Sequence, residues 1–373
     1  MKGAEVLVWI AGTRWDEAVP GTDRRLVTAV AKRRRVLWID PPIPWRPGRR
    51  TPTPQITEVA AGVTRVRVIA PPGVTRPGIR VLTAAILERA VLDAVREIKV
   101  EAIGVLVSFP LASFPKDLAG TKILYVTDDW LGGSEQLGFS KAAVRTVLVS
   151  NLKAADVVMT VSPFLSMQLD GLSSELKLTT PSPRVLPNGC PAPFSPARPE
   201  SRREPVVGVV GQLNERLDLN VLEAVRSTGV DIRVIGPRIE ATRGYQSRMT
   251  AFLRSPNVNW FDAIPASKVP AELARLGVGL TPYADTAFNR ASFPLKTLEY
   301  LAAGVAVVST DLPSVRWLAS DLIRVSSDPT LFAHLVTAAL EEKDDEALNA
   351  RRRKFASGHT WEHRADELLA ILN

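Results

Sequence analysis

Apolar residues in the first half of the chain form short runs, separated by longer segments in which apolar residues recur every three or four positions. The short runs are typical of buried strands. They are Val6–Ile10, Val36–Ile39, Val66–Ile69, Ile103–Val107, Ile123–Val126, Val157–Val161 and Arg184–Leu186. The segments Asp23–Ala31 and Ile79–Ile98 have helical spacing. Alternating strands and helices predict a parallel, doubly wound sheet and therefore an α/β fold.

The same pattern starts again after a stretch rich in proline and polar residues, so the sequence predicts two domains of similar construction. The second set comprises strands at Val206–Val210, Asp231–Ile235, Val258–Phe261 and Val278–Leu280, with helices at Leu217–Ser227 and Val269–Leu276. We place one Rossmann-like domain at 1–190, a linker at 191–204, a second Rossmann-like domain at 205–357 and an amphipathic tail at 358–373. Because open α/β sheets bind ligands at the carboxyl ends of their strands, we expect a ligand-binding cleft between the two domains.

Residues 288–313 form the most informative segment, which reads as a loop, a short helix, a glycine stop and a buried strand. Pro294 suits the first helical turn, and Gly304 suits the position just past the helix end. Val305–Val308 is an apolar run typical of a buried parallel strand. Lys296 and Glu299 are three residues apart and share one face near the helix start. A cation and a carboxylate beside the N–H groups of a helix start suit a ligand with phosphate and hydroxyl groups.

This segment resembles the C-terminal donor site of retaining glycosyltransferases of family 4. Those enzymes have the GT-B fold, in which two Rossmann-like, doubly wound domains face a central cleft. Their motif has two glutamates separated by seven residues; the second matches Glu299, whereas Ala291 stands in place of the first. The variant from Pro294 to Ala302 is similar to a subgroup that includes teichuronic acid biosynthesis enzymes. Other motifs follow in the family's order along nearly the whole chain, at Asp40–Pro42, Val126–Trp130, Ala155–Ser162, Leu186–Gly189 and Val209–Leu213.

The resemblance implies that a hexosyl group is transferred with retention from a nucleotide sugar, a UDP-sugar being favoured, to a glycan, a lipid-linked or a small-molecule acceptor. The nucleotide sugar is a substrate, and neither a cofactor nor a metal ion is expected. The resemblance also assigns donor binding to the second domain and acceptor binding to the first, and it brings the final helix back onto the first domain.

Cations near two helix starts are the candidates for holding the donor diphosphate. Val206–Val210 leads into Gly211, where the backbone can approach a phosphate, and then into Gln212 and Arg216. By the resemblance, Arg216 and Lys296 clamp the diphosphate, and we class both as catalytic because they would stabilise the departing group. Glu299 would accept hydrogen bonds from the ribose. The structural alternatives are an exposed salt bridge for Arg216 and an ordinary surface pair for Lys296 with Glu299.

Ala291 cannot make the contact to the transferred sugar that the family's first glutamate makes. Arg290 is either a third phosphate contact or a charge on the surface of a loop. We expect the sugar contact to come from the first domain or from a set of neighbouring groups: Asn289, Arg290 and the backbone of Ser292, Phe293, Pro294 and Leu295.

Two loops of the first domain supply further candidates. Asp128 and Asp129 follow the strand that ends near Thr127, where they could bind sugar hydroxyls, hold a metal ion or position an acceptor; we class Asp128 as catalytic, and its alternative role is a helix N-cap. The loop after the first strand lies where relatives contact donor and acceptor. Its candidate residues are Gly12, Thr13, Arg14 and Asp16.

Composition restricts the remaining possibilities. The 373 residues include a single cysteine, Cys190, which excludes an internal disulfide and argues against a metal site built on cysteines. All three histidines lie at or beyond His334. The sequence contains no run of about 18 apolar residues, so it predicts no membrane span. The first residues do not have a signal-peptide layout. These features predict a cytoplasmic protein.

Positive charge is concentrated in the first half. Residues 1–195 contain 25 Lys and Arg against 17 Asp and Glu, whereas residues 196–373 contain 22 of each. This excess is either a solvated basic face or a surface that attracts an anionic partner, which would be phospholipid, a lipid diphosphate or a polyanionic glycan. Attraction to phospholipid would place the protein at the inner face of the membrane. The sequence contains no nucleic-acid-binding motif, so nucleic acid is not expected as a partner. The charge is densest at Arg24, Arg25, Lys32–Arg35, Arg46, Arg49 and Arg50.

Two other functions are compatible with the same fold. A nucleotide-sugar 2-epimerase would use histidine and acidic residues in the cleft, and the first half has no histidine. A non-catalytic scaffold or activator is favoured by Ala291 and Gln212, whereas the presence of Lys296 and Glu299 argues against it.

Overall fold

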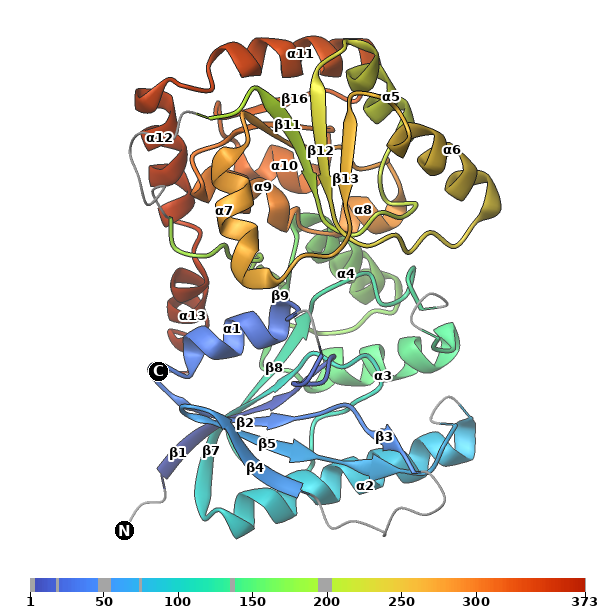
Figure 1. Ribbon diagram of the computed structural model, residues 1–373. Helices are drawn as coiled ribbons and strands as arrows, with labels where there is room; N and C mark the ends of the chain where they lie inside the picture. Colours follow the sequence, from blue (N-terminus) through green and yellow to red (C-terminus); the bar gives the residue numbers. More distant parts are fainter. Residues whose placement is uncertain are drawn as a thin grey trace. The chain divides into compact units, whose positions relative to one another are not determined.

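The computed structural model describes residues 4–17, 20–45, 55–73, 76–134, 138–193 and 203–372 of the chain. The chain divides into two compact units (Figure 1): unit 1 comprises residues 1–187 and 362–373, and unit 2 comprises residues 188–361. Each unit is built on a predominantly parallel sheet with helices, as the sequence predicts.

Unit 1 contains an eight-stranded sheet in the order β10-β9-β8-β7-β1-β2-β5-β4. Its strands are β1 (Ala4–Ile10), β2 (Arg35–Ile39), β4 (Gln55–Ala60), β5 (Val63–Arg67), β7 (Val100–Val107), β8 (Thr121–Val126), β9 (Val157–Thr160) and β10 (Arg184–Val185). Neighbouring strands pair in parallel except β4 and β5, which form an antiparallel hairpin at the sheet edge. The sequence pattern misses β4 because most of its residues are exposed or half-buried and form no apolar run.

One expected strand, Val66–Ile69, is divided between two sheets. The chain leaves the main sheet after β5, and the short strand β6 (Ile69–Ala70) pairs with β3 (Ile43–Pro44) in a separate two-stranded sheet. The carbonyl of Val68 accepts a hydrogen bond from the Ile43 N–H at 2.8 Å, which continues this second pairing. The apolar run is therefore continuous in the sequence, although its two ends pair with different strands.

The helices of unit 1 cover both faces of its sheet. Figure 1 shows α1 and α2 on opposite faces, as right-handed crossovers that run in opposite directions along the sheet require: α1 leads from β1 to β2, and α2 leads back to β7. The helices are α1 (Thr22–Val30), α2 (Pro77–Glu97), α3 (Lys141–Ala154), α4 (Pro163–Glu175) and α13 (Trp361–Leu369), which begins at the boundary of unit 2. Residues just after α1 hold α13: Lys32 pairs with Glu362 at 2.6 Å and Arg33 with Asp366 at 2.9 Å.

Unit 2 contains a six-stranded, all-parallel sheet in the order β13-β12-β11-β14-β15-β16. Its strands are β11 (Val206–Val210), β12 (Asp231–Ile235), β13 (Val258–Phe261), β14 (Val278–Thr281), β15 (Ala306–Ser309) and β16 (Ile323–Val325). Its helices are α5 (Leu219–Ser227), α6 (Arg243–Leu253), the 3₁₀ helix η1 (Ala266–Lys268), α7 (Val269–Arg275), α8 (Ala287–Ala291), α9 (Leu295–Ala302), α10 (Pro313–Leu318), α11 (Pro329–Glu341) and α12 (Glu346–Ser357).

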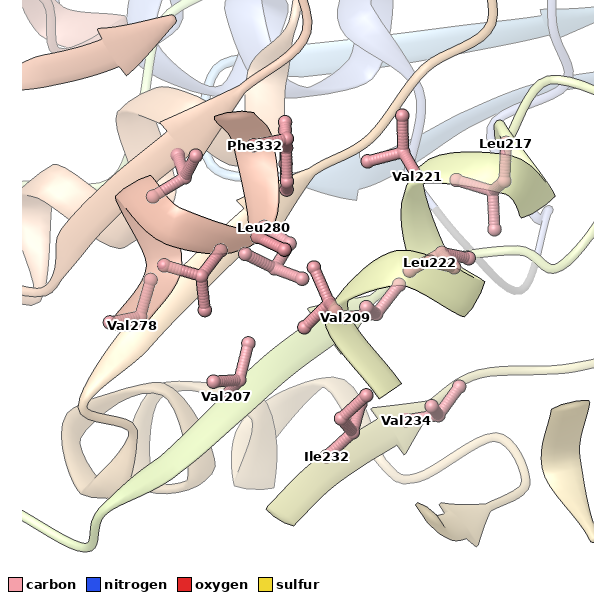
Figure 2. Close-up of a cluster of buried hydrophobic side chains, with 14 of the residues drawn as sticks. Val207, Val209, Leu217, Val221, Leu222, Ile232, Val234, Val278, Leu280 and Phe332 are labelled. Atoms are coloured by element: carbon pink, nitrogen blue, oxygen red, sulfur yellow. The ribbon is translucent and has the colours of Figure 1, made fainter. Parts of the chain in front are cut away.

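Alternate residues of the central strands of unit 2 serve its two faces. On one face, Val207 and Val209 pack with Leu222 of α5 and with Leu280 of β14, in a cluster that also includes Phe332 of α11 (Figure 2). These side chains are at most 3% exposed. Apolar burial of this kind supplies most of the free energy that favours folding.

The end of the expected linker is folded into unit 2. Residues 194–202 lie outside the described residues, but Arg203 is buried and donates hydrogen bonds to the carbonyls of Ala274 and Ala303 at 3.0 and 2.7 Å. Burial and, to a smaller extent, the nearby cations Arg352 and Arg353 lower the pKa of Arg203 to about 10. Among the helices that the structure describes, none combines the length and the apolar character needed to cross a bilayer.

Candidate functional site

The strand order of unit 2 locates a ligand-binding crevice. Chain connections run from β11 to β12 and β13 on one side and to β14, β15 and β16 on the other. In open α/β sheets, ligands bind outside the carboxyl ends of the strands where this direction reverses. Here that point lies between β11 and β14, so Gly211 after β11 and residues 282–290 after β14 border it.

A glycine in the sheet brings α9 close to this crevice. A Cβ atom on Gly279 would lie 2.3 Å from the ring of Tyr300, so only glycine leaves room for that side chain. The Tyr300 hydroxyl accepts a hydrogen bond from the Val210 N–H at 3.0 Å and donates one to the Gly208 carbonyl at 3.3 Å. Tyr300 is fully buried, and burial raises its pKa, so the hydroxyl keeps its proton. The tyrosine therefore fixes the start of α9, one turn earlier, beside the end of β11.

Lys296 and Glu299 form the centre of the site. Lys296 Nζ lies 2.5 Å from Glu299 Oε2, and the two side chains are only 22% and 6% exposed. A surface pair at this spacing would be far more exposed, so burial argues against that alternative. A Cβ atom built on Gly211 would lie 3.9 Å from Lys296 Cε, which places the lysine side chain over the glycine turn. The sequence therefore identified three residues that the fold brings together.

Gly211 needs the conformational freedom of glycine. Its φ is +147°, and Gly236, which directly follows the neighbouring strand β12, has φ +148°. A Cβ atom on Gly236 would lie 1.8 Å from the Gly211 carbonyl oxygen, so the ends of β11 and β12 approach through backbone alone. Gln212, next in the chain, is exposed. This backbone-only surface suits the close approach of a phosphate.

Arg216 lies in the turn before α5. We expected it at a helix start, but α5 begins at Leu219, because the Asp218 carboxylate caps it by accepting the N–H groups of Asn220 and Val221 at 2.9 and 3.4 Å. The apolar spacing predicts a helix start at Leu217, two residues before the observed start, so the loop between β11 and α5 is longer than expected. Arg216 therefore owes its position to side-chain contacts rather than to the helix.

Those contacts come from the segment after β14. Arg216 Nε donates to Asn289 Oδ1 at 2.8 Å, and Asn289 Nδ2 donates back to the Arg216 carbonyl at 2.9 Å. The guanidinium carbon lies 5.4 Å from the ring centre of Tyr283 and 4.9 Å from that of Phe288, distances typical of cation–π attraction. The exposed salt bridge considered from sequence is not what holds Arg216: a reciprocal amide clamp and two aromatic rings orient the cation.

The backbone around Ala291 offers fewer donors than the sequence suggests. The Ser292 N–H donates to the Phe288 carbonyl at 3.0 Å and the Leu295 N–H to the Phe293 carbonyl at 2.9 Å, while Pro294 has no N–H and forms the N-cap rather than the first turn of α9. The Phe293 ring packs edge-on against Trp317, with ring centres 6.0 Å apart. Of this stretch, the Phe293 N–H is the backbone donor that fits the expected sugar contact best.

Arg290 is better explained as a surface charge. Its guanidinium makes a two-fold contact with Asp285, with Nε–Oδ1 and Nη2–Oδ2 distances of 2.5 and 2.6 Å. The side chain is 49% exposed, and Arg290 lowers the pKa of Asp285. Of the two roles left open for Arg290, the pairing favours the loop charge over a phosphate contact.

In unit 1, the loop after β1 is anchored by a buried carboxylate. Asp23 Oδ2 accepts hydrogen bonds from the Gly12 N–H at 2.9 Å and from the Ser108 hydroxyl at 2.8 Å. Asp23 is 4% exposed, and its Oδ1 has no hydrogen-bond partner among the described residues. Burial raises the pKa of Asp23 to about 6, although the bonds from Gly12 and Ser108 oppose the shift. Sequence reasoning missed Asp23, because nothing in helical spacing marks a buried acid.

The other candidate residues of this loop differ in whether a ligand can reach them. Asp16 contacts Arg65 at 3.1 Å and Arg67 at 2.6 Å, and these cations lower its pKa although burial opposes them. Arg14 is exposed, its N–H donates to Glu17 at 3.0 Å, and Thr13 lies beside Gly21. Asp16 is thus occupied by arginines, whereas Gly12, Thr13 and Arg14 form the part of the loop that a ligand can approach.

Asp128 and Asp129 have different environments. Asp129 is 9% exposed and its Oδ1 accepts the Gly132 N–H at 2.7 Å, which makes it the anchor of a tight turn. Asp128 is half-buried after β8. It is not a helix N-cap: the next helix, α3, begins at Lys141 with Ser140 as its cap. Within the described residues, no three His, Cys, Asp or Glu side chains cluster closely enough to hold a metal ion.

The basic run Lys32–Arg35 is largely neutralised. Besides the two pairs with α13, Arg34 contacts Glu5 at 3.4 Å. Arg46, Arg49 and Arg50 lie outside the described residues. The densest part of the basic charge therefore has a structural role in unit 1.

Comparisons with known proteins find similarity to glycosyltransferases. A glycosyl transferase-like family model matches residues 216–370. A Bacillus subtilis (strain 168) protein described as a teichuronic acid biosynthesis glycosyltransferase, TuaH, is 27% identical over 238 residues. That match covers 60% of this chain and 58% of the relative's length.

Solved structures identify the fold. Sucrose-phosphate synthase of Thermosynechococcus elongatus is similar with a TM-score of 0.73 at 14% identity, over 99% of this chain and 98% of that one. The Anabaena protein HepE, solved in complex with UDP, has a TM-score of 0.66 at 12% identity, over 99% of both chains. A UDP-forming trehalose-phosphate synthase of Burkholderia xenovorans, solved with glucose-6-phosphate, has a TM-score of 0.65 at 14% identity, over 99% of this chain and 100% of that one. The fold of this chain is GT-B, which confirms the predicted architecture.

Proposed function

We propose that the protein is a retaining glycosyltransferase of family 4 type that takes a sugar from a nucleotide sugar bound by unit 2. The observation that carries this proposal is the pair of half-buried Lys296 and buried Glu299 over Gly211, at the switch point of the unit 2 sheet. The partial match to a glycosyl transferase-like family and to TuaH supports the activity. The UDP complex of a protein with the same fold supports a UDP-sugar as the donor.

Each donor-site residue has a role that follows from its charge and position. The ammonium group of Lys296 and the guanidinium of Arg216 stabilise the negative charge that develops on the departing diphosphate. The carboxylate of Glu299 accepts hydrogen bonds from ribose hydroxyls while it fixes Lys296. Both cations are held before the donor binds, so little reorganisation accompanies the reaction. Charge stabilisation by these groups requires neither a metal ion nor a side-chain acid.

The acceptor is proposed to bind to unit 1, near Gly12, Thr13, Arg14 and Asp128. It is a glycan, a lipid-linked or a small-molecule acceptor, and transfer takes place in the cytoplasm. Contact with an anionic membrane would rely on basic residues other than Lys32, Arg33 and Arg34, whose charges are paired.

A calorimetric titration with UDP tests the donor site. Replacing Lys296 or Arg216 with Ala removes a hydrogen bond to a charged group, so each variant should lose about 1.5–3 kcal/mol of binding free energy. The double variant should bind UDP more weakly than either single variant. Unchanged UDP affinity in a folded double variant would contradict the proposed site.

A further inference from the structure

The first two turns of α2, in unit 1, carry an apolar face that is exposed to solvent (Figure 1). It consists of Gly78, Val81, Leu82 and Ala85, which share one side of the helix because the last three follow Gly78 by three, four and seven residues. All four residues are exposed, and Val81 and Leu82 are 68% and 50% exposed. A surface helix ordinarily presents polar or charged side chains on its outward side. The apolar face of α2 departs from that pattern.

A different side of α2 packs against the rest of unit 1. Thr83 and Leu87 are buried, at 3% and 4% exposed, as are residues further along the same side. Residues two positions apart on a helix point in roughly opposite directions, so Val81 and Ala85 face away from this packed side. Single exposed apolar side chains are common on proteins, whereas adjacent ones bordered by polar residues mark an interaction surface.

Arginines without acidic partners border the apolar face. Arg76 is the exposed N-cap residue of α2, and Arg80 is half-buried one turn later. Among the residues that the structure describes, no carboxylate pairs with either guanidinium. The sequence has no Asp or Glu between Glu58 and Glu88, and the Glu88 carboxylate accepts the Lys116 N–H at 2.7 Å. The charge that borders the apolar face is therefore positive.

An apolar face bordered by cations suits the surface of an anionic phospholipid bilayer. Val and Leu side chains enter the boundary between headgroups and acyl chains, while arginine side chains keep their charged ends at the lipid phosphates. A second copy of the chain fits less well. A symmetric contact would bring the arginines of two identical faces together, and two helical turns offer far less than the roughly 1,200–2,000 Å² that stable interfaces bury.

We propose that unit 1 docks on an anionic phospholipid membrane through the apolar face of α2, with Arg76 and Arg80 at the lipid phosphates. This inference goes beyond glycosyl transfer and does not depend on it. It assigns membrane contact to α2 and not to Lys32, Arg33 and Arg34, whose charges are paired within unit 1.

Co-sedimentation of the full chain with vesicles tests the inference. The vesicles contain phosphatidylcholine alone or with roughly one third phosphatidylglycerol, and the protein should prefer the anionic ones at low salt and lose this preference at high salt. Replacing both Val81 and Leu82 with Ser should weaken binding at least about tenfold. Arg76→Gln and Arg80→Gln should each weaken it about fivefold. Leu331→Ser, at an equally exposed leucine of α11 in unit 2, is the matched control and should bind as wild type does.

A variant that gains binding guards against losses that come from misfolding. Gly78→Leu adds an apolar side chain to the same face, where a Cβ atom would meet no atom within 4 Å, so it should bind anionic vesicles at least about threefold more tightly. Gly171→Leu is the matched control, since Gly171 is an exposed glycine of α4 in unit 1 that also meets no atom within 4 Å. It should bind as wild type does.

A wild-type protein without preference for anionic vesicles at low salt would overturn the inference. Undiminished binding by a folded protein with Ser at 81 and 82 would overturn it as well, because arginines alone would then explain the attraction. Sedimentation velocity without vesicles tests the second copy: a dimer that this double variant dissociates would assign the face to self-association instead. UDP titration separates this proposal from the donor site, since failure of either one leaves the other measurement unchanged.

Discussion

Glu299 is almost completely buried and already holds the ammonium group of Lys296, so a substitution at this residue affects two contacts. Glu299→Gln should weaken UDP binding more than binding of 2′-deoxy-UDP. The loss of Lys296 positioning is common to both ligands, whereas a hydrogen bond from the 2′-hydroxyl to the charged carboxylate, worth about 1.5–3 kcal/mol, exists only for UDP. Calorimetry with both nucleotides measures the difference. Equal losses would argue against ribose binding by Glu299.

Asn289 is expected to act through Arg216. It is 1% exposed and exchanges two hydrogen bonds with that residue. Asn289→Ala should therefore lower UDP affinity, and adding Arg216→Ala should cost little more, because the two residues work as a unit. Arg290→Ala is the matched control from the same segment and should leave UDP affinity unchanged, since Arg290 pairs with Asp285. Additive losses in the double variant would contradict the clamp.

At the scale of elements, Asp23 connects the ends of β1 and β7 with the start of α1 through Gly12 and Ser108. Its folded-state pKa of about 6 lies above the ordinary value of 3.8. The folded state therefore binds the proton more tightly, and the stability that this proton provides is complete below about pH 4 and is lost as the pH rises through 6. The shift corresponds to about 3 kcal/mol.

The Asp23→Asn variant should not lose this stability as the pH rises, because the amide oxygen still accepts from Gly12 and the group no longer titrates. Urea unfolding at pH 4, 5, 6 and 7 measures it: the stability of wild type relative to Asp23→Asn should fall by up to about 3 kcal/mol between pH 4 and 7. Taking the difference cancels the contributions of acids whose pKa is lowered, such as Asp16 and Asp285. A stability difference between wild type and Asp23→Asn that does not change with pH would show that the pKa of Asp23 is not raised in the folded protein.

At the scale of the whole molecule, the sequence predicts the GT-B architecture and the bounds of β11, β12 and β13 without error. Each of these strands is a short segment rich in apolar residues between turn residues, so the local pattern suffices. The hairpin strand β4 is not predicted, because its polar residues satisfy backbone pairing without an apolar pattern. The sequence pattern likewise does not predict the helices α3, α4, α6, α8, α10, α11 and α12.

Contacts among the candidate donor-site residues are predicted where the residues are close in the chain and missed where they are distant. Lys296 and Glu299 lie on one helix, so helical spacing alone brings them together. Arg216 and Asn289 are 73 residues apart, and only the pairing of β11 with β14 brings their loops together. Burial of Glu299 also depends on tertiary packing. The sequence therefore predicts which residue types could form the site, whereas the contacts between distant residues depend on the order of the strands.

The central claim is that unit 2 activates a nucleotide sugar by stabilising its diphosphate with protein cations. Incubation with a panel of nucleotide sugars, with and without EDTA, tests it most directly, with release of nucleoside diphosphate as the readout. The account predicts slow release from at least one nucleotide sugar, UDP-sugars first, at the same rate in EDTA and at least about tenfold slower in Lys296→Ala. Release that stops in EDTA and returns with Mg²⁺ or Mn²⁺, or release that is unchanged in Lys296→Ala, would contradict it.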